Sequence, residues 1–384
     1  MKKILALLLA MAMVFSLAAC GSSAGSNNAS ATPTEAPSAP AEGSAQPDEG
    51  TAPNEGKAEV ALIVGAADTI DDRGFFQSTY EGIEEFCTAN NLTYTYYQPS
   101  ENTEDALYEV IDLAVLNGAK VICSTGGGFI GLMENVFAAY PDLYFICNET
   151  PFTTPAKNSV IYIFQAQQSA FLAGVAAVYE GYKELGVIGG VPIPPVNRPC
   201  FGFIQGVNWA ANELGLTDIN VRMWYCGSLE QSPDAQTTAA AWYQDGVELI
   251  GCFCGGAAVS IFAAAEANNG LTIGTDVDQS SVSNTVITSN LKNVKQSTVD
   301  GLQLWLDGEF DKVGGSLLNM GIAEGGMDLE MENAKFTTFS QEQYDELSQK
   351  IINGEITIYT AEDFDTVSDL WAAMDQHINL QIIE

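Results

Sequence analysis

The 384-residue sequence has little positive charge and a single histidine. It contains 14 Lys and Arg against 49 Asp and Glu, and its net charge is −35. Nucleic-acid binding depends on basic side chains that neutralise phosphates, so this balance argues against a nucleic-acid partner. No Ser-His-Asp, Cys-His or zinc-ligand cluster can be assembled from His377, and GGGF at 126–129 lacks the spacing and the lysine of a phosphate-binding loop. We therefore expect no enzyme, no cofactor and no metal site.

The sequence also lacks a hydrophobic run long enough to span a membrane. Its amino-terminal apolar run, Ile4 to Leu17, follows Lys2 and Lys3 and is too short to cross about 30 Å of hydrocarbon. Residues 1–19 therefore read as a secretory signal peptide. The ending LAAC resembles the lipobox of bacterial lipoproteins, which implies that Cys20 is lipidated and anchors the chain on the extracytoplasmic face of the cell membrane. An ordinary signal with a chance cysteine is the alternative.

The segment 20–57 is rich in Ser, Ala, Pro, Gly and Glu and has no large hydrophobic residue. Such a segment cannot bury enough apolar surface to offset its ordering entropy, so we expect a disordered tether. About 325 residues remain from Lys57 onward, more than one hydrophobic core usually supports. The composition therefore favours two lobes.

Seven cysteines follow Cys20. An odd number outside the cell argues against a complete disulfide framework. Several lie in apolar runs such as VICST and LIGCFC, which is typical of small buried hydrophobic residues.

The folded region alternates short β-branched runs with segments of helical periodicity. AEVALIVGA at 58–66 reads as a buried strand, Phe75 to Asn91 as a helix, and the alternation recurs to LTIGTD, with a helix expected at 200–214. Repeated β-α-β units imply an α/β fold with two doubly wound parallel sheets. Ligands bind beyond the carboxyl ends of such strands. The loops expected there are 66–76, 124–131, 190–202, 226–232, 254–258 and 276–283.

Six segments, in order, resemble motifs of one family. They are DDRGFFQSTYEG, QQSAFLAGVAA, LGVIGGVPIPPVNR, CGGAAVSIFAAAEANN, IGTDVDQSS and VITSNLKNV. The chain resembles the basic membrane protein family of substrate-binding lipoproteins, the purine-nucleoside receptor type that feeds ABC importers. The resemblance implies a two-lobed type I periplasmic-binding-protein fold with a ligand cleft between the lobes. We expect lobe 1 at 58–164 with 284–322 returning to it, and lobe 2 at 165–283 with 323–384 mostly on it. The expected crossings lie near Phe164, Val282 and Ile322.

By this resemblance Phe75 stacks on the base, Asp276 accepts the ribose hydroxyls and Lys292 adds a donor. Gly255 and Gly256 would bring backbone amides close to the ligand. The remaining candidate ligand-binding residues are Asp72, Phe76, Gln77, Gly127, Arg198 and Phe201. Two alternatives stay open: Asp72 as a helix cap, and Phe75 as a hydrophobic residue over a helix start.

The base side departs from the family pattern, because Phe76, Gly131 and Pro199 stand where the family has Asn, Asp and Phe. We therefore expect a nucleoside or related heteroaromatic solute, captured between closing lobes and delivered to the permease and ATPase subunits of an ABC importer. A ligand-sensing lipoprotein of the same fold that signals to a membrane receptor is the alternative. Residues 357–384 extend beyond the resemblance and have no functional account.

Overall fold

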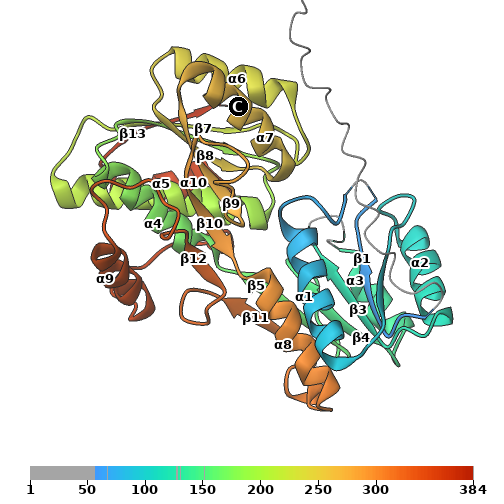
Figure 1. The fold of residues 1–384 in the computed structure, drawn as a ribbon. Coiled ribbons are helices and arrows are strands. Elements are labelled where there is room, and N and C mark those ends of the chain that lie inside the picture. Colours follow the sequence, from blue (N-terminus) through green and yellow to red (C-terminus); the bar gives the residue numbers. More distant parts are fainter. Residues whose placement is uncertain (1–56, 67, 127–128, 130, 151, 384) are drawn as a thin grey trace, which may run out of the picture. The chain divides into compact units, whose positions relative to one another are not determined.

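The computed structural model of the protein describes residues 57–66, 68–126, 129, 131–150 and 152–383. The predicted signal peptide, Cys20, the tether up to residue 56 and Gly127 lie outside these residues. Helices flank two mostly parallel sheets (Figure 1), which confirms the predicted α/β class. Within the described part of the chain, no helix is long and apolar enough to cross a membrane.

The first sheet has six strands, and all of its pairs are parallel. Its order is β11 (Ser316–Met320), β5 (Ser159–Phe164), β4 (Tyr144–Asn148), β3 (Val121–Thr125), β1 (Val60–Ile63) and β2 (Tyr94–Tyr97). Its helices are α1 (Phe75–Asn90), α2 (Glu104–Leu116), α3 (Met133–Ala139) and α8 (Val294–Leu306), and a 3-10 turn, η3 (Phe310–Lys312), follows α8. Buried β-branched and aromatic side chains of these strands form one hydrophobic core.

The second sheet has seven strands and is parallel except for β12. Its order is β12 (Met327–Leu329), β10 (Val286–Lys292), β9 (Leu271–Asp276), β8 (Leu249–Phe253), β6 (Glu184–Gly189), β7 (Asn220–Tyr225) and β13 (Asn379–Ile383). The strand β13 lies within the segment 357–384, so this segment completes an edge of the second sheet.

Helices cover the second sheet, and two of them approach closely. These helices are α4 (Ala166–Tyr179), α5 (Pro194–Leu214), α6 (Pro233–Gln244), α7 (Ala258–Asn268), α9 (Gln341–Ile352) and α10 (Val367–Ala373), and the 3-10 turn η2 (Gly255–Ala257) precedes α7. A Cβ at Gly174 of α4 would lie 2.4 Å from the Phe203 carbonyl oxygen, and one at Gly206 of α5 would lie 2.0 Å from that of Phe171. Glycine at these positions lets the two helix backbones meet.

The helix α5 begins earlier than the predicted residue 200. Pro194 and Pro195 occupy its first turn, where their fixed φ favours the helix and their missing N–H groups cost nothing. Much of the predicted 190–202 loop is therefore helical. Arg198 and Phe201 lie on this helix and not on a loop.

The chain passes between the two sheets three times in the described residues. It does so between β5 and α4, between β10 and α8, and between β11 and β12. These passages are joined by hydrogen bonds from Gln165 N to Met320 O (2.9 Å) and from Asn293 N to Gly326 O (2.9 Å). The second passage comes after β10 and not near Val282, because β10 pairs with β9 in the second sheet.

Candidate functional site

Three residues that the sequence predicts for the ligand site lie together. Phe75 begins α1, and Lys292 and Asp276 end β10 and β9. The Lys292 Nζ lies 4.5 Å from the centroid of the Phe75 ring and 3.1 Å from Asp276 Oδ1. The side chains of Lys292 and Asp276 are only 4% and 13% exposed. A cation, a carboxylate and an aromatic ring thus meet at strand ends and a helix start, where the fold rule for parallel sheets places ligands.

Asp276 combines an unusual backbone with unused acceptor capacity. Its φ of 71° lies in the left-handed region, which is uncommon for residues other than glycine and clusters at functional sites. Its Oδ1 atom is buried and pairs with Lys292 as an ion pair, but it accepts no hydrogen bond from described residues. A buried carboxylate oxygen normally accepts hydrogen bonds, so a ligand hydroxyl or amine would satisfy it.

Asp72 acts as the structural brace of α1. Its Oδ1 accepts from the N–H groups of Gly74 (2.9 Å) and Gln77 (3.0 Å), and its Oδ2 accepts from that of Phe76 (3.1 Å). These bonds satisfy donors at the helix start, as a cap does. The pKa of Asp72 is raised chiefly by desolvation of its carboxylate, against the lowering effect of these bonds, and Asp276 adds to the rise.

Two further carboxylates belong to the same neighbourhood. The pKa of Asp68, in the loop before α1, rises to about 6 through desolvation and the charges of Asp72 and Glu230. Glu230 lies in the predicted 226–232 loop of the second sheet. Both residues fall in loops that the sequence marks as ligand-binding, but nothing in their local pattern distinguishes them there. The resulting acidic rim favours ligands that carry hydrogen-bond donors over anions.

Arg198 is engaged in buried ion pairs. Its side chain is 1% exposed, its Nη1 lies 3.0 Å from Glu149 Oε2, and its Nη2 lies 2.5 Å from Glu362 Oε1. The other oxygen of Glu149 accepts from the Phe164 N–H at 3.2 Å. Arg198 therefore joins α5, the segment after β4 and the carboxyl-terminal segment. This corrects the expectation that Arg198 lies on a loop; its contact with a ligand stays a prediction, and both of its terminal nitrogens pair with carboxylates.

The structure does not bring the other predicted aromatic residues to the group. Phe201 is fully buried in the core of the second sheet, and Phe76 is 5% exposed in that of the first. Phe201 lies in a stretch of α5 that is buried from Val196 to Asn208, and Phe76 lies on the buried face of α1. Phe164 was not predicted, yet its ring lies edge-on to Phe75 with centroids 6.4 Å apart. Its position at the carboxyl end of β5 is the sequence feature that could have predicted a place near the ligand.

Gln77 and the two glycines have structural partners. Gln77 accepts from the Arg73 N–H (3.1 Å) and donates to Glu81 (2.8 Å). A Cβ at Gly255 or Gly256 would lie 3.1 or 3.2 Å from the Leu229 carbonyl oxygen, and Gly255 has a φ of 57°. The missing side chains of these glycines thus let the 226–232 loop pack against them. Their amide contacts with a ligand stay a prediction.

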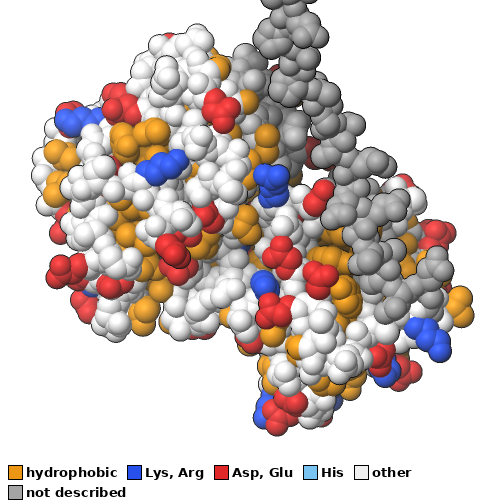
Figure 2. Space-filling model, in the orientation of Figure 1, with side chains coloured by type: hydrophobic (Ala, Val, Ile, Leu, Met, Phe, Trp, Pro, Cys, Tyr) orange, Lys and Arg blue, Asp and Glu red, His pale blue; other side chains and the backbone are white. Residues whose placement is uncertain are grey.

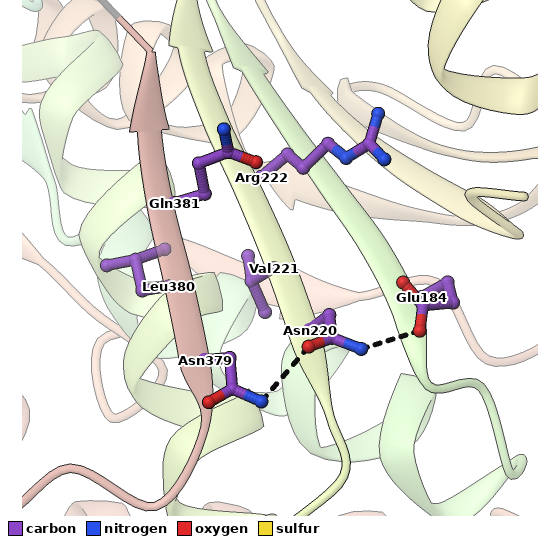
Figure 3. A pocket seen from close by; sticks show the side chains of 7 residues that line it. All are labelled: Glu184, Asn220, Val221, Arg222, Asn379, Leu380 and Gln381. Atoms are coloured by element: carbon purple, nitrogen blue, oxygen red, sulfur yellow. Dashed lines mark hydrogen bonds between the residues drawn. The ribbon is translucent and has the colours of Figure 1, made fainter. Parts of the chain in front are cut away.

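Two surface hollows of about 330 and 320 Å³ are lined by other residues. The first is lined by Glu184, Asn220, Val221, Arg222, Asn379, Leu380 and Gln381 (Figure 3). There Asn379 donates to Asn220 (3.0 Å) and Asn220 donates to Glu184 (2.6 Å), so these polar groups satisfy one another. The second is lined by residues of β10, β12 and α9, with Tyr344 among them. Neither hollow includes Phe75, Lys292 or Asp276, so we base the candidate site on the contacts of that group.

Two mostly parallel α/β sheets joined by three passages form a fold that solved ABC-transporter solute-binding proteins share. A crystal structure of an ABC transporter system solute-binding protein from Aeropyrum pernix K1 matches the fold with a TM-score of 0.71 and 23% identity, covering 82% of this chain and 97% of that one. Residues 58–362 match the Bmp family model, described as ABC transporter substrate-binding protein PnrA-like. The chain therefore belongs to this family, which confirms the resemblance.

Relatives agree with this assignment. The ABC transporter nucleoside-binding protein BmpA of Lactococcus lactis is 28% identical over 321 residues, covering 78% of this chain and 88% of that protein. Basic membrane protein A2 of Borrelia garinii is 29% identical over 330 residues, covering 81% of this chain and 91% of that protein. The family and fold are those of solute-binding proteins and not of enzymes. Among the described residues, no group of three or more His, Cys, Asp or Glu side chains is arranged to hold a metal ion.

Proposed function

We propose that the protein is the extracytoplasmic receptor of an ABC importer and binds a nucleoside or a related heteroaromatic solute. The observation that carries the proposal is the meeting of Phe75, Lys292 and Asp276, within 4.5 and 3.1 Å contacts. Phe75 lies more than 200 positions before Asp276 and Lys292 in the chain. The lactococcal relative, named as a nucleoside-binding protein, supports the same solute class.

The chemistry of the three side chains suits the two halves of a nucleoside. An aromatic ring stacks on a flat base, and base–aromatic stacking contributes about 1–3 kcal/mol. A buried carboxylate oxygen that accepts no hydrogen bond from described residues, such as Asp276 Oδ1, can accept ribose hydroxyls beside its ion pair with Lys292. Lys292 already holds Asp276 and covers one face of Phe75, so it would both orient the carboxylate and donate to the sugar.

Capture would use motion of two lobes, 58–164 with 294–322 and 165–292 with 323–384, about the three passages between the sheets. Hinges of this kind lie where few strands of chain connect two bodies. Since β10 pairs within the second sheet, we place the hinge position of the second passage at Asn293. Opening would move Lys292 and Asp276 away from Phe75 and release the solute to the permease.

The membrane partner follows from the family and from the amino terminus. A substrate-binding protein of an ABC transporter works with permease and ATPase subunits, and LAAC at 17–20 would anchor the chain through lipidated Cys20. The visible face in Figure 2 carries dispersed Asp and Glu side chains with isolated Lys and Arg among them. Such a surface is consistent with a small neutral or cationic solute and no nucleic-acid partner.

A thermal-shift screen of the chain from Lys57 onward, against nucleosides, free bases and other heteroaromatic compounds, tests the proposal. A ligand that binds only the folded state raises Tm in proportion to ln(1 + [L]/Kd). We expect nucleosides to raise Tm in the parent chain and in Asp307→Ala, an exposed control, but not in Asp276→Ala. No response to any nucleoside, or an equal response in Asp276→Ala, would contradict the proposed ligand or its site.

A further inference from the structure

Two cysteines lie at the carboxyl ends of β7 and β8, the strands that flank β6 in the second sheet. Cys226 follows β7 and Cys254 follows β8. The Cys226 Sγ donates to Ser228 O (3.3 Å) and lies 4.0 Å from the carbonyl oxygen of Gly190, the residue against which the Cys254 backbone packs. Both are free cysteines; Cys226 is partly exposed and Cys254 is fully buried. The other described cysteines, Cys87, Cys123, Cys147, Cys200 and Cys252, are all buried. The pair therefore combines one partly exposed cysteine with one that is fully buried.

A glycine brings the two cysteines together across an intervening strand. The strand β6 lies between β7 and β8, so their cysteines would ordinarily stand two strands apart. Cys226 N donates to Gly189 O (2.9 Å), and Gly190 N donates to Phe253 O (3.1 Å). A Cβ at Gly190 would lie only 3.2 Å from the Cys254 Cα. Because Gly190, directly after β6, carries no side chain, the Cys254 backbone can pack against it on the side of Cys226.

The environment gives the two thiols different reactivity. Interaction with the Cys254 thiol is the main cause that lowers the pKa of Cys226 to about 7, and the same interaction together with burial raises the pKa of Cys254. Cys226 therefore loses its proton more readily than Cys254. A partly exposed, low-pKa thiol next to a second thiol is the arrangement of a reactive cysteine with its resolving partner.

We propose that Cys226 and Cys254 form a thiol–disulfide site that reacts with low-molecular-weight disulfides. The Cys226 thiolate attacks one sulfur of the small disulfide, forms a mixed disulfide and releases one small thiolate. Cys254 then loses its proton to solvent and attacks Cys226 Sγ, which forms the internal disulfide and releases the second small thiolate. The protein dithiol is oxidised to a disulfide, and the small disulfide is reduced to two thiols.

The internal disulfide would tie together two of the loops that the sequence predicts at the ligand mouth. The segment 226–232 carries Glu230, and its Leu229 carbonyl already lies against Gly255 and Gly256. Closing a loop of about 28 residues restricts the unfolded chain, so the oxidised protein should unfold at a Tm about 5 °C higher. This inference concerns the thiols alone and holds whatever solute the protein binds.

Peptide mapping of the full chain tests the site. The protein is reduced, desalted, treated with glutathione disulfide, alkylated and digested for mass spectrometry. We expect a peptide that joins Cys226 to Cys254, lighter than the reduced pair by two hydrogen atoms, in the parent chain and in the control Cys252→Ala. In Cys254→Ser, we expect glutathione to remain on Cys226, because the resolving thiol is missing.

The peptides found in the parent chain decide the test, so the result does not depend on how well a variant folds. A lasting glutathione adduct on Cys226 in the parent chain would show that Cys254 does not reach it. An unmodified Cys226, or a disulfide between Cys226 and Cys200, would likewise overturn it.

Discussion

The loops after β1 and β6 occupy equivalent places in the two sheets but carry different chemistry. The orders β5-β4-β3-β1-β2 and β10-β9-β8-β6-β7 match strand for strand. After β1, an acidic loop leads to Phe75, whose ring is half-buried at the start of α1. After β6, prolines begin α5 directly, and the aromatic residues Phe201 and Phe203 are fully buried. The first sheet therefore supplies the ring of the candidate site, and the second supplies its charges.

The packing of α5 explains this division. Its close approach to α4 at Gly202 and Gly206 leaves no space between the helices for a side chain. Its polar residues are bound by the carboxyl-terminal segment: Gln205 exchanges hydrogen bonds with the Tyr359 backbone (2.8 and 2.9 Å), and Arg198 pairs with Glu362. A helix held on so many sides cannot present a ring to a ligand as the start of α1 does.

Removing the Arg198 charge should have the largest effect on stability. In Arg198→Ala, Glu149 would remain buried without its partner, so we expect a loss of about 3–5 kcal/mol in the free energy of unfolding. Urea unfolding measures it. Arg222→Ala, which breaks the more exposed pair with Asp245, should cost less than about 1 kcal/mol. If Arg198→Ala cost little free energy of unfolding but abolished ligand binding, Arg198 would instead be a ligand contact.

Filling the gap between α4 and α5 should have the next largest effect. Gly206→Ala places a Cβ 2.0 Å from the Phe171 backbone oxygen, and only a movement of one helix would relieve this contact. We therefore expect a loss of about 2–3 kcal/mol in the free energy of unfolding. In the first sheet, Gly82→Ala of α1 meets the Lys295 carbonyl at 2.8 Å and should cost less. Denaturant midpoints compare the two variants. An equal cost would show that α1 and α8 are packed as rigidly as α4 and α5.

The adjacent residues Phe75 and Phe76 should separate binding from stability. Phe75→Ala removes a half-buried ring, and we expect ligand affinity to fall about 10- to 100-fold, the equivalent of one lost stacking contact. Phe76→Leu changes a 5% exposed core residue and should lower Tm while affinity stays within about twofold. Calorimetric titration with the ligand found in the screen measures both. The reverse pattern would move the stacking role to Phe76.

The acidic rim should produce the smallest effect, a dependence of stability on pH. The folded-state pKa of Asp68 lies at about 6, above its value in the unfolded chain. Its proton therefore stabilises the fold fully below about pH 4, and this contribution is lost as pH rises through about 6. Between pH 7 and pH 5, the parent chain should gain about 1 kcal/mol more than Asp68→Asn. Thermal unfolding at both pH values measures the difference, with Asp307→Asn as an exposed control. Identical pH profiles would contradict the raised pKa.

Much of the fold was predictable because its signals are local. The β-branched runs gave β1, β3 and β5, and helical periodicity gave α1 and α2, since burial on both faces of a parallel sheet leaves a continuous apolar pattern. The start of α5 was placed too late, because Pro194 to Pro199 reads as a loop unless the first-turn role of proline is applied. The expected first lobe includes β10, but β10 pairs with β9 in the second sheet. That pairing depends on the neighbouring strand and not on the residues of β10 alone.

The sequence by itself determined the family, the α/β class and three members of the candidate site, because the motifs holding Phe75, Asp276 and Lys292 end strands or begin a helix. Only the tertiary structure decided which of the remaining candidates are occupied elsewhere. Arg198 pairs with Glu149 and Glu362, respectively 49 and 164 residues away along the chain. Cys226 and Cys254 both lie against Gly190 of a third segment. Such contacts are set by strand order and helix packing, so no local pattern around these residues contains them.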